Sequence, residues 1–428
     1  MAGVPRAMAG KPVESSVFVG VEDLRGEGTD VVLDRVVNEF GATGVTVAAA
    51  YHRARDLTPH GSPRVTIRHD GVHFIPDDDL FGGLRLQPPV QRGANEHPLR
   101  SLREATTERG VALSGWTVFC HNTTLGEANP DCTIENAFGE RGSPADLCPS
   151  HPDVRAYALA LGRNVARLEV DEVVAESLHF GTFDHGYHHE RCFVTLGGID
   201  RFLLGLCFCM FCTDFAKQRG VDAETARVVC QQSLAAVLDG GAPSSDKVSP
   251  EGVAIYGGSV LADYTTSRVQ SVTELATVVS EAVTEAGSRL AFLDGTGAVK
   301  GYAGGTPGGR LAADDAWQLG VDPAGLGQHV PAYSVLAYAR DTARARDDVA
   351  AYRAALGGKP QLRVVLRPFL PDTESAAHLA AKVAAVIDAG ADAVDFYHYG
   401  LAPLNDLRRI PVALQALRDS ETRGDEPR

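Results

Sequence analysis

The sequence predicts an α/β fold, a single (β/α)8 barrel of the TIM type, on three observations. Short runs of β-branched and aromatic residues alternate with longer runs whose apolar residues recur at helical spacing. Eight such strand–helix units follow one another, and this alternation is typical of a parallel sheet covered by helices. The chain has 428 residues, against roughly 250 for an ordinary barrel. We therefore expect long loops between regular units.

The expected strands are short runs rich in β-branched and aromatic residues, at 16–24, 44–52, 111–122, 171–180, 288–297, 329–341, 361–369 and 392–400. Amphipathic helices are expected at 30–42, 97–110, 151–170, 348–358, 374–390 and 405–419, with more between 180 and 286. The surplus length falls after the second, fourth and fifth strands. We expect the barrel to span residues 15–420, with a helical, zinc-stabilised insertion at about 180–255 and disordered ends at 1–14 and 421–428.

The charge balance limits the partners of the chain. Its 40 basic and 55 acidic residues give a net charge of −15, and no basic stripe is present, so we expect no nucleic-acid partner. The apolar runs are too short for a membrane span, and residues 1–16 lack the apolar core of a signal peptide. These features predict a cytoplasmic protein whose eight cysteines are thiols or metal ligands. The sequence leaves open whether the chain forms a homo-oligomer.

Polar and aromatic side chains follow almost every expected strand. Barrel enzymes carry out their chemistry at the C-terminal ends of the strands, where these side chains would share one rim. Imidazoles, carboxylates and aromatic rings along a rim suit a sugar-like ligand, which offers apolar faces for stacking and hydroxyls for hydrogen bonds. The predicted binding residues are Tyr51, His52, Trp116, His121, Asn122, His179, His185, Arg367, Asp395, His398 and Tyr399.

Three carboxylates are the candidates for acid/base chemistry. Cleavage of a glycosidic bond usually needs one protonated and one ionised carboxyl group. Glu176 ends an apolar strand, where burial would raise its pKa, so we predict that it is the general acid. Asp294 and Asp23 also follow strands, and we predict that one of them is the base or nucleophile.

The histidine-rich run at 179–190 has three interpretations. It could form a substrate wall in which His185 or His179 handles protons. It could instead hold a divalent metal ion, or it could be a solvated loop without a function. The metal would draw on His179, Asp184, His185, His188, His189 or Glu190.

Cys207, Cys209 and Cys212 form a C-x-C-x-x-C cluster. Three thiolates at this spacing can bind one zinc ion, and a fourth must come from elsewhere in the chain. Cys148 is the leading candidate because it opens the segment CPSHPDVRAY just before a helix. The alternative is that these cysteines are small buried apolar residues.

This cluster resembles that of the zinc-containing family 42 glycoside hydrolases, β-galactosidases with a similar C-x-C-x-x-C after the strand-four acid/base glutamate and a similar upstream Cys-Pro segment. The resemblance implies that Cys148, Cys207, Cys209 and Cys212 are ligands of a structural zinc ion and that Glu176 is the acid/base residue. The family carries its nucleophilic glutamate at the end of strand seven, where this chain has Arg367 and Pro368.

The favoured prediction is therefore a glycosidase-like hydrolase that acts on a small carbohydrate or glycoside. Two alternatives stay open. One is a metal-dependent isomerase or lyase acting on a sugar or cyclitol, with a second divalent metal held by the strand-four histidines. The other is a sugar-binding barrel without catalysis.

Overall fold

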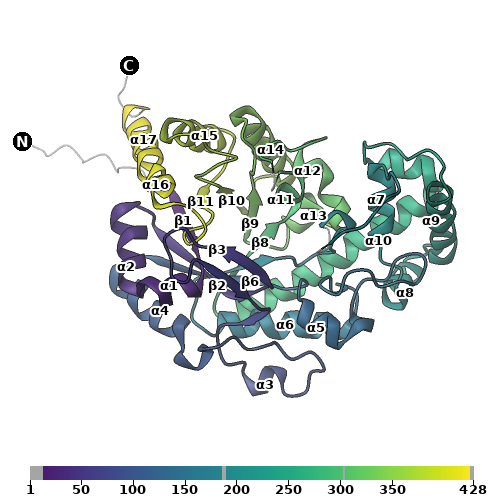
Figure 1. Ribbon diagram of the computed structural model, residues 1–428, viewed down its shortest axis with the longest axis horizontal. Coiled ribbons are helices and arrows are strands. Elements are labelled where there is room, and N and C mark those ends of the chain that lie inside the picture. Colours follow the sequence, from purple (N-terminus) through teal and green to yellow (C-terminus); the bar gives the residue numbers. More distant parts are fainter. Residues whose placement is uncertain (1–12, 186–188, 302–303, 425–428) are drawn as a thin grey trace, which may run out of the picture.

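The chain forms a closed barrel of eight parallel strands in a computed structural model that describes residues 13–185, 189–301 and 304–424 (Figure 1). Each strand pairs with the next, and β1 pairs with both β2 and β11, which closes the sheet. The predicted (β/α)8 fold is confirmed. The barrel strands are β1 (Glu14–Val19), β2 (Gly44–Tyr51), β6 (Ala112–Val118), β7 (Glu172–Glu176), β8 (Arg289–Asp294), β9 (Ala332–Leu336), β10 (Gln361–Leu366) and β11 (Ala393–Phe396).

Helices surround the barrel strands (Figure 1). The longer ones are α4 (Pro98–Arg109), α6 (Pro152–Ala166), α10 (Pro250–Glu285), α14 (Thr342–Leu356), α15 (Ala376–Asp388) and α17 (Arg409–Gly424), and α2 (Thr29–Asp34) is extended by a π-helical turn at Arg35–Glu39. Short helices lie in the loops: α1 (Val21–Glu27), α3 (Asp78–Phe81), α5 (Thr123–Ala128), α11 (Thr296–Gly301), α12 (Ala312–Asp315), α13 (Pro323–Leu326) and α16 (Leu404–Leu407).

The ends of the barrel differ from the prediction at both termini. Glu14, expected to be disordered, is the first residue of β1, and α17 continues to Gly424 instead of ending near 419. The first strand ends before Gly20, so Glu22 and Asp23 lie in the first turn of α1 rather than at a strand end. Acidic residues are favoured in the first turn of a helix because of the helix dipole. Val13, also expected to be disordered, packs against the core, and residues 1–12 and 425–428 lie outside the described residues.

Side chains alternate between the inside of the barrel and its helix-covered outside, as the pleat of a strand requires. Phe18, Ala48, Trp116, Val174 and Leu293 pack together inside, whereas residues of opposite parity pack against the helices. This alternation decides which polar residue at a strand end can face the mouth of the barrel.

The floor of the barrel is a buried ion network. Arg363 of β10 donates two hydrogen bonds to Asp395, of 2.9 and 2.7 Å. Its guanidinium also lies 3.7 Å from Glu172 and 3.5 Å from Glu14, the first residues of their strands. Asp395 therefore faces the N-terminal end of the barrel.

The loop after β2 folds into a hairpin, β3 (Ala54–Leu57) and β4 (Val65–Arg68), followed by the short strand β5 (Gly71–Val72). The hairpin contacts the rim of the barrel. The Arg68 guanidinium lies 4.2 Å from the centroid of the Tyr51 ring. At the hairpin tip, His60 contacts the Glu27 carboxylate at 2.8 Å and the Tyr399 carbonyl at 3.0 Å.

The loop after β7 carries a helical insertion with its own core. Helices α7 (Gly198–Leu204), α8 (Met210–Lys217) and α9 (Ala223–Leu238) extend beside the barrel with the first half of α10 (Figure 1). Ile199, Leu203, Phe208, Leu234 and Tyr264 are among the residues that form this second apolar cluster. The second half of α10 packs on α6 and β8 as an ordinary barrel helix. In the described part of the chain, no helix is both long and apolar enough to cross a membrane.

Candidate active site

Glu176 is the last residue of β7 and has the parity of Val174, so its side chain points into the mouth of the barrel. The Trp116 indole N–H donates a hydrogen bond to its Oε2. Burial is the largest influence on the Glu176 carboxyl and raises its pKa, although the Trp116 hydrogen bond and the charges of His121 and Arg68 oppose this shift. A buried carboxyl group with a raised pKa is suited to donate a proton.

Glu176 lines a cavity of about 120 Å³ between the ends of β2, β6, β7 and β8. This volume is below the ~300–1,000 Å³ typical of ligand pockets, so the cavity as it stands encloses a single ring or less. The polar side chains on its wall are His52, His121, Asp146, Glu176, Ser177, His179, Thr182 and His185.

His121 and Asp146 form a hydrogen-bonded pair on this wall, with Nδ1 of His121 3.1 Å from the Asp146 carboxylate. Burial alone would lower the pKa of His121, but the hydrogen bond to Asp146 and nearby carboxylates outweigh it and raise that pKa. Burial alone would raise the pKa of Asp146, but the contact with His121 outweighs it and lowers that pKa. The pair therefore favours an ionised Asp146 beside a charged imidazole.

Sequence reasoning missed Asp146. This residue lies in the loop between β6 and α6, far from any strand end, and pairs with His121 as an isolated β-bridge. It also lines an adjoining cavity of about 120 Å³, with Asn136, Glu140 and Glu190 among its neighbours. No signal at strand ends could have found it, because a loop of about thirty residues separates it from β6.

Three further predicted histidines meet at this cavity. His52 stacks on Tyr51, with ring centroids 4.3 Å apart, and its ring lies 5.3 Å from that of His121. The ring of His185 lies 4.9 Å from that of His121. Burial lowers the pKa of His52 to about 3 and also lowers the pKa values of His179 and His185. These imidazoles are therefore neutral near pH 7.

The described histidines do not assemble the predicted metal site. Within the described ranges, no three of the predicted ligands bring their donor atoms within 4.8 Å of one another. Asp184 instead pairs with Arg201 at 3.2 Å on the surface. His188 lies outside the described residues.

Asp294 does not face the cavity, although its neighbours Leu293 and Gly295 line it. Its parity is opposite to that of Leu293, so the carboxylate points into the helix layer. There it is fully buried and accepts hydrogen bonds from the Thr296 amide and hydroxyl and from the hydroxyls of Tyr333 and Tyr352. The position of Asp294 gives no support to the predicted catalytic role.

Asp23 lines a different cavity, of about 240 Å³, beneath the tip of the β3–β4 hairpin. Its carboxylate accepts the Gly20 N–H at 2.8 Å and lies 4.0 Å from Nδ1 of His398. Burial raises the pKa of Asp23 to about 7, with the Gly20 hydrogen bond opposing this shift and Glu22 adding to it. Asp23 is a perturbed acid, but it does not line the cavity of Glu176.

The other predicted binding residues divide into two groups. Trp116 and Tyr51 lie in the mouth, where their ring centroids are 4.2 Å apart, and the ring of His398 lies 6.0 Å from that of Trp116. Four residues are instead held by contacts elsewhere, so their predicted contact with a ligand lacks geometric support. Asn122 caps α5, Arg367 pairs with Asp372, Asp395 binds Arg363 in the barrel floor, and Tyr399 is buried against Arg35 and Glu27.

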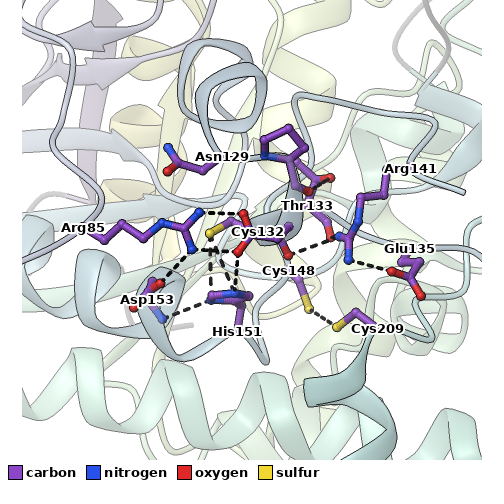
Figure 2. Close-up of polar contacts among 12 residues, drawn as sticks. Arg85, Asn129, Cys132, Thr133, Glu135, Arg141, Cys148, His151, Asp153 and Cys209 are labelled. Atoms are coloured by element: carbon purple, nitrogen blue, oxygen red, sulfur yellow. Dashed lines mark hydrogen bonds and ion pairs between the residues drawn. The ribbon is translucent and has the colours of Figure 1, made fainter. Parts of the chain in front are cut away.

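The four predicted zinc cysteines meet in one buried cluster. The Sγ atom of Cys148 lies 3.8, 3.6 and 3.4 Å from those of Cys207, Cys209 and Cys212. A tetrahedral site with Zn–S bonds of about 2.3 Å places its sulfurs roughly 3.8 Å apart. Figure 2 shows Cys148, in the loop between β6 and α6, directed at Cys209 of the insertion. The geometry of these residues fits a tetrahedral ion.

Asp131, Cys132 and His151 also bring possible ligand atoms together. Figure 2 shows Cys132 and His151 near Cys148. Arg85 already holds the Asp131 carboxylate, at 2.7 and 2.6 Å. Nδ1 of His151 accepts the Asp153 N–H at 3.1 Å, which leaves the hydrogen of a neutral ring on Nε2. This group is therefore better explained as a helix cap and ion pair than as a metal site.

Comparison with known proteins gives the fold of the chain. No protein-family model and no curated protein sequence matches it. It is similar to the catalytic domain of a β-amylase from Paenibacillus polymyxa, with a TM-score of 0.53 and 10% identity over 97% of this chain and 99% of that one. It is also similar to a β-galactosidase from Marinomonas ef1, with a TM-score of 0.52 and 11% identity over 96% of this chain and 61% of that one.

A third similar structure is α-L-fucosidase isoenzyme 2 from Paenibacillus thiaminolyticus, with a TM-score of 0.51 and 12% identity over 96% of this chain and 50% of that one. At these identities the similarity shows a barrel fold that glycoside hydrolases share. The resemblance to family 42 has no support from sequence comparison and stays a hypothesis.

Proposed function

We propose that this chain is a glycoside hydrolase in which Glu176 is the general acid and Asp146 is the base. The observation that carries this proposal is that two carboxyl groups on one cavity have pKa values shifted in opposite directions, that of Glu176 upward and that of Asp146 downward. Such a pair identifies a proton donor and a proton acceptor. The barrel fold shared with solved glycosidases agrees with this assignment.

In this mechanism Glu176 gives its proton to the glycosidic oxygen as the bond to the anomeric carbon breaks. A water molecule attacks the anomeric carbon, and Asp146 accepts the proton that the water loses. His121 donates a hydrogen bond to Asp146 and keeps it ionised. Trp116 orients Glu176 through its N–H, and its ring packs against Tyr51 and Phe18 in the buried core of the barrel, which holds the indole in place.

The test is hydrolysis of aryl glycosides by Glu176→Gln and Asp146→Asn, with exposed Asp239→Asn as the control. Loss of either proton-transfer group should lower kcat by about 10²–10⁴-fold. Glu176→Gln should recover on substrates whose phenol leaves without a proton, and Asp146→Asn should not.

Two outcomes would contradict the proposal. Wild-type protein that binds sugars without turnover would identify a sugar-binding barrel. Activity that chelators remove and divalent metal restores would favour the isomerase or lyase alternative.

We further propose that a structural zinc ion is held by Cys148, Cys207, Cys209 and Cys212. It would join the loop between β6 and α6 to the insertion. A buried arginine supports this. Arg268 is 3% exposed, and no described residue forms a hydrogen bond with its Nε or with one of its Nη atoms. Burial lowers the pKa of Arg268, and the charges that oppose this shift come mainly from Cys212 and Cys207. A buried cation without hydrogen bonds is costly, so thiolates nearby would offset it.

A further inference from the structure

Two imidazoles that line the cavity beside Glu176, the buried His179 and the partly exposed His52, are held by the same kind of contact. Nδ1 of His179 lies 2.9 Å from the Phe180 carbonyl oxygen, and Nδ1 of His52 lies 3.0 Å from the Arg53 carbonyl oxygen. A carbonyl oxygen can only accept a hydrogen bond, so each Nδ1 carries the hydrogen. In the neutral ring, Nε2 then has a lone pair and no hydrogen.

The lone pair of His179 has no partner among the described residues. His179 is 8% exposed, and its Nε2 makes no hydrogen bond. This atom faces Gly295 across the cavity wall, where an added Cβ would come within 3.0 Å of it. A buried acceptor without a donor is unfavourable. A bound molecule that brings a donor would remove this cost.

On the far side of the mouth, His398 adopts the other neutral tautomer. Its Nδ1 accepts the Gly400 N–H at 3.2 Å, so in the neutral ring Nε2 carries the hydrogen. This Nε2 also makes no hydrogen bond within the part of the chain that the structure describes. The mouth therefore has acceptors next to β2 and β7 and a donor next to β11.

We infer that His179 and His52 determine specificity by accepting hydrogen bonds from two free hydroxyl groups of a neutral sugar ring. This inference rests on the proposed glycosidase function. A carboxylate, sulfate or phosphate group at these positions has no hydrogen to donate and would place a negative oxygen against the lone pair. The site should therefore select neutral glycosides over uronates and over sulfated or phosphorylated sugars.

The experiment uses calorimetry on the full chain with Glu176→Gln, which prevents turnover. The probes are the methyl β-glycosides of glucose, galactose and mannose and the corresponding uronates. At least one neutral glycoside should bind, and its uronate should bind about tenfold more weakly or worse. A deoxyfluoro analogue that lacks the hydroxyl facing His179 should lose affinity by a similar factor, because fluorine cannot donate a hydrogen bond.

The second variant adds His179→Phe, with exposed His329→Phe as the matched control. His179→Phe should weaken binding of the neutral glycoside and abolish the difference in affinity between it and the deoxyfluoro analogue. His329→Phe should change neither the affinity nor the difference. Neutral binding that is indifferent to His179→Phe, or a uronate that binds as tightly, would overturn the inference alone. If no glycoside binds and none is hydrolysed by the wild type, the proposed function fails as well.

Discussion

Replacement of Asp294 separates a structural role from the catalytic role that the sequence predicted. Its carboxylate accepts bonds of 2.9 and 2.6 Å from Thr296 and of 2.8 and 2.9 Å from the hydroxyls of Tyr333 and Tyr352. In Asp294→Asn, one amide oxygen can keep the Thr296 bonds, but the NH2 group faces two hydroxyl donors. A hydrogen bond to a buried charged group contributes about 1.5–3 kcal/mol. One tyrosine can rotate its hydroxyl to accept, so we expect a loss of about 2–4 kcal/mol in unfolding free energy.

The assay is urea unfolding together with kcat on an aryl glycoside. Tyr352→Phe is the matched variant, because it removes one donor and leaves the carboxylate intact. It should cost about 1–2 kcal/mol, and the double variant should lose less than the sum because both changes remove the same bond. A general base would behave differently, with kcat lowered by about 10²–10⁴-fold and stability unchanged. That result would refute the structural role and restore Asp294 as a catalytic candidate.

Four further variants test the remaining parts of the molecule. Cys148→Ser should lose the single zinc expected by elemental analysis of the purified protein, whereas Cys230→Ser, a buried cysteine outside the cluster, should keep it. Arg268→Met should weaken zinc retention against a chelator, and unchanged retention would show that the arginine does not balance the thiolates. Asp395→Asn should destabilise the barrel by about 3–5 kcal/mol with KM unchanged, because Arg363 keeps a buried charge without its main partner. Asp23 has a folded-state pKa of about 7, above its unfolded value, so the stability it contributes is complete below pH 4 and lost as pH rises through 7. Asp23→Asn should therefore be more stable than wild type at pH 8, by up to about 4 kcal/mol, but not at pH 4, as measured by urea unfolding at both values.

The fold could be predicted because each barrel unit carries its own signal. Strand 44–51 carries the β-branched run Val45–Val47 and is buried throughout, and the helix at 98–109 has one apolar face. The hairpin at 54–68 and the loop carrying Asp146 gave no such signal, because their structure depends on contacts distant in the sequence. Asp70 shows this: its carboxylate accepts the Arg53 and Thr124 amides, which fixes the base of the hairpin against α5. Nothing in the local sequence around Asp70 predicts either partner.

Strand parity explains which of the candidate acids face the mouth of the barrel, as the sequence predicted, and which do not. Glu176 follows Val174 at a spacing of two, so an inward Val174 requires an inward Glu176. Asp294 follows Leu293 at a spacing of one and must point outward once Leu293 points inward. Asp395 points inward, level with Val365 of β10, but its carboxylate is held by Arg363, whose guanidinium also reaches the first residues of β1 and β7. A rule that treats every polar residue near a strand end as equivalent therefore groups three acids that the barrel separates by face and by depth.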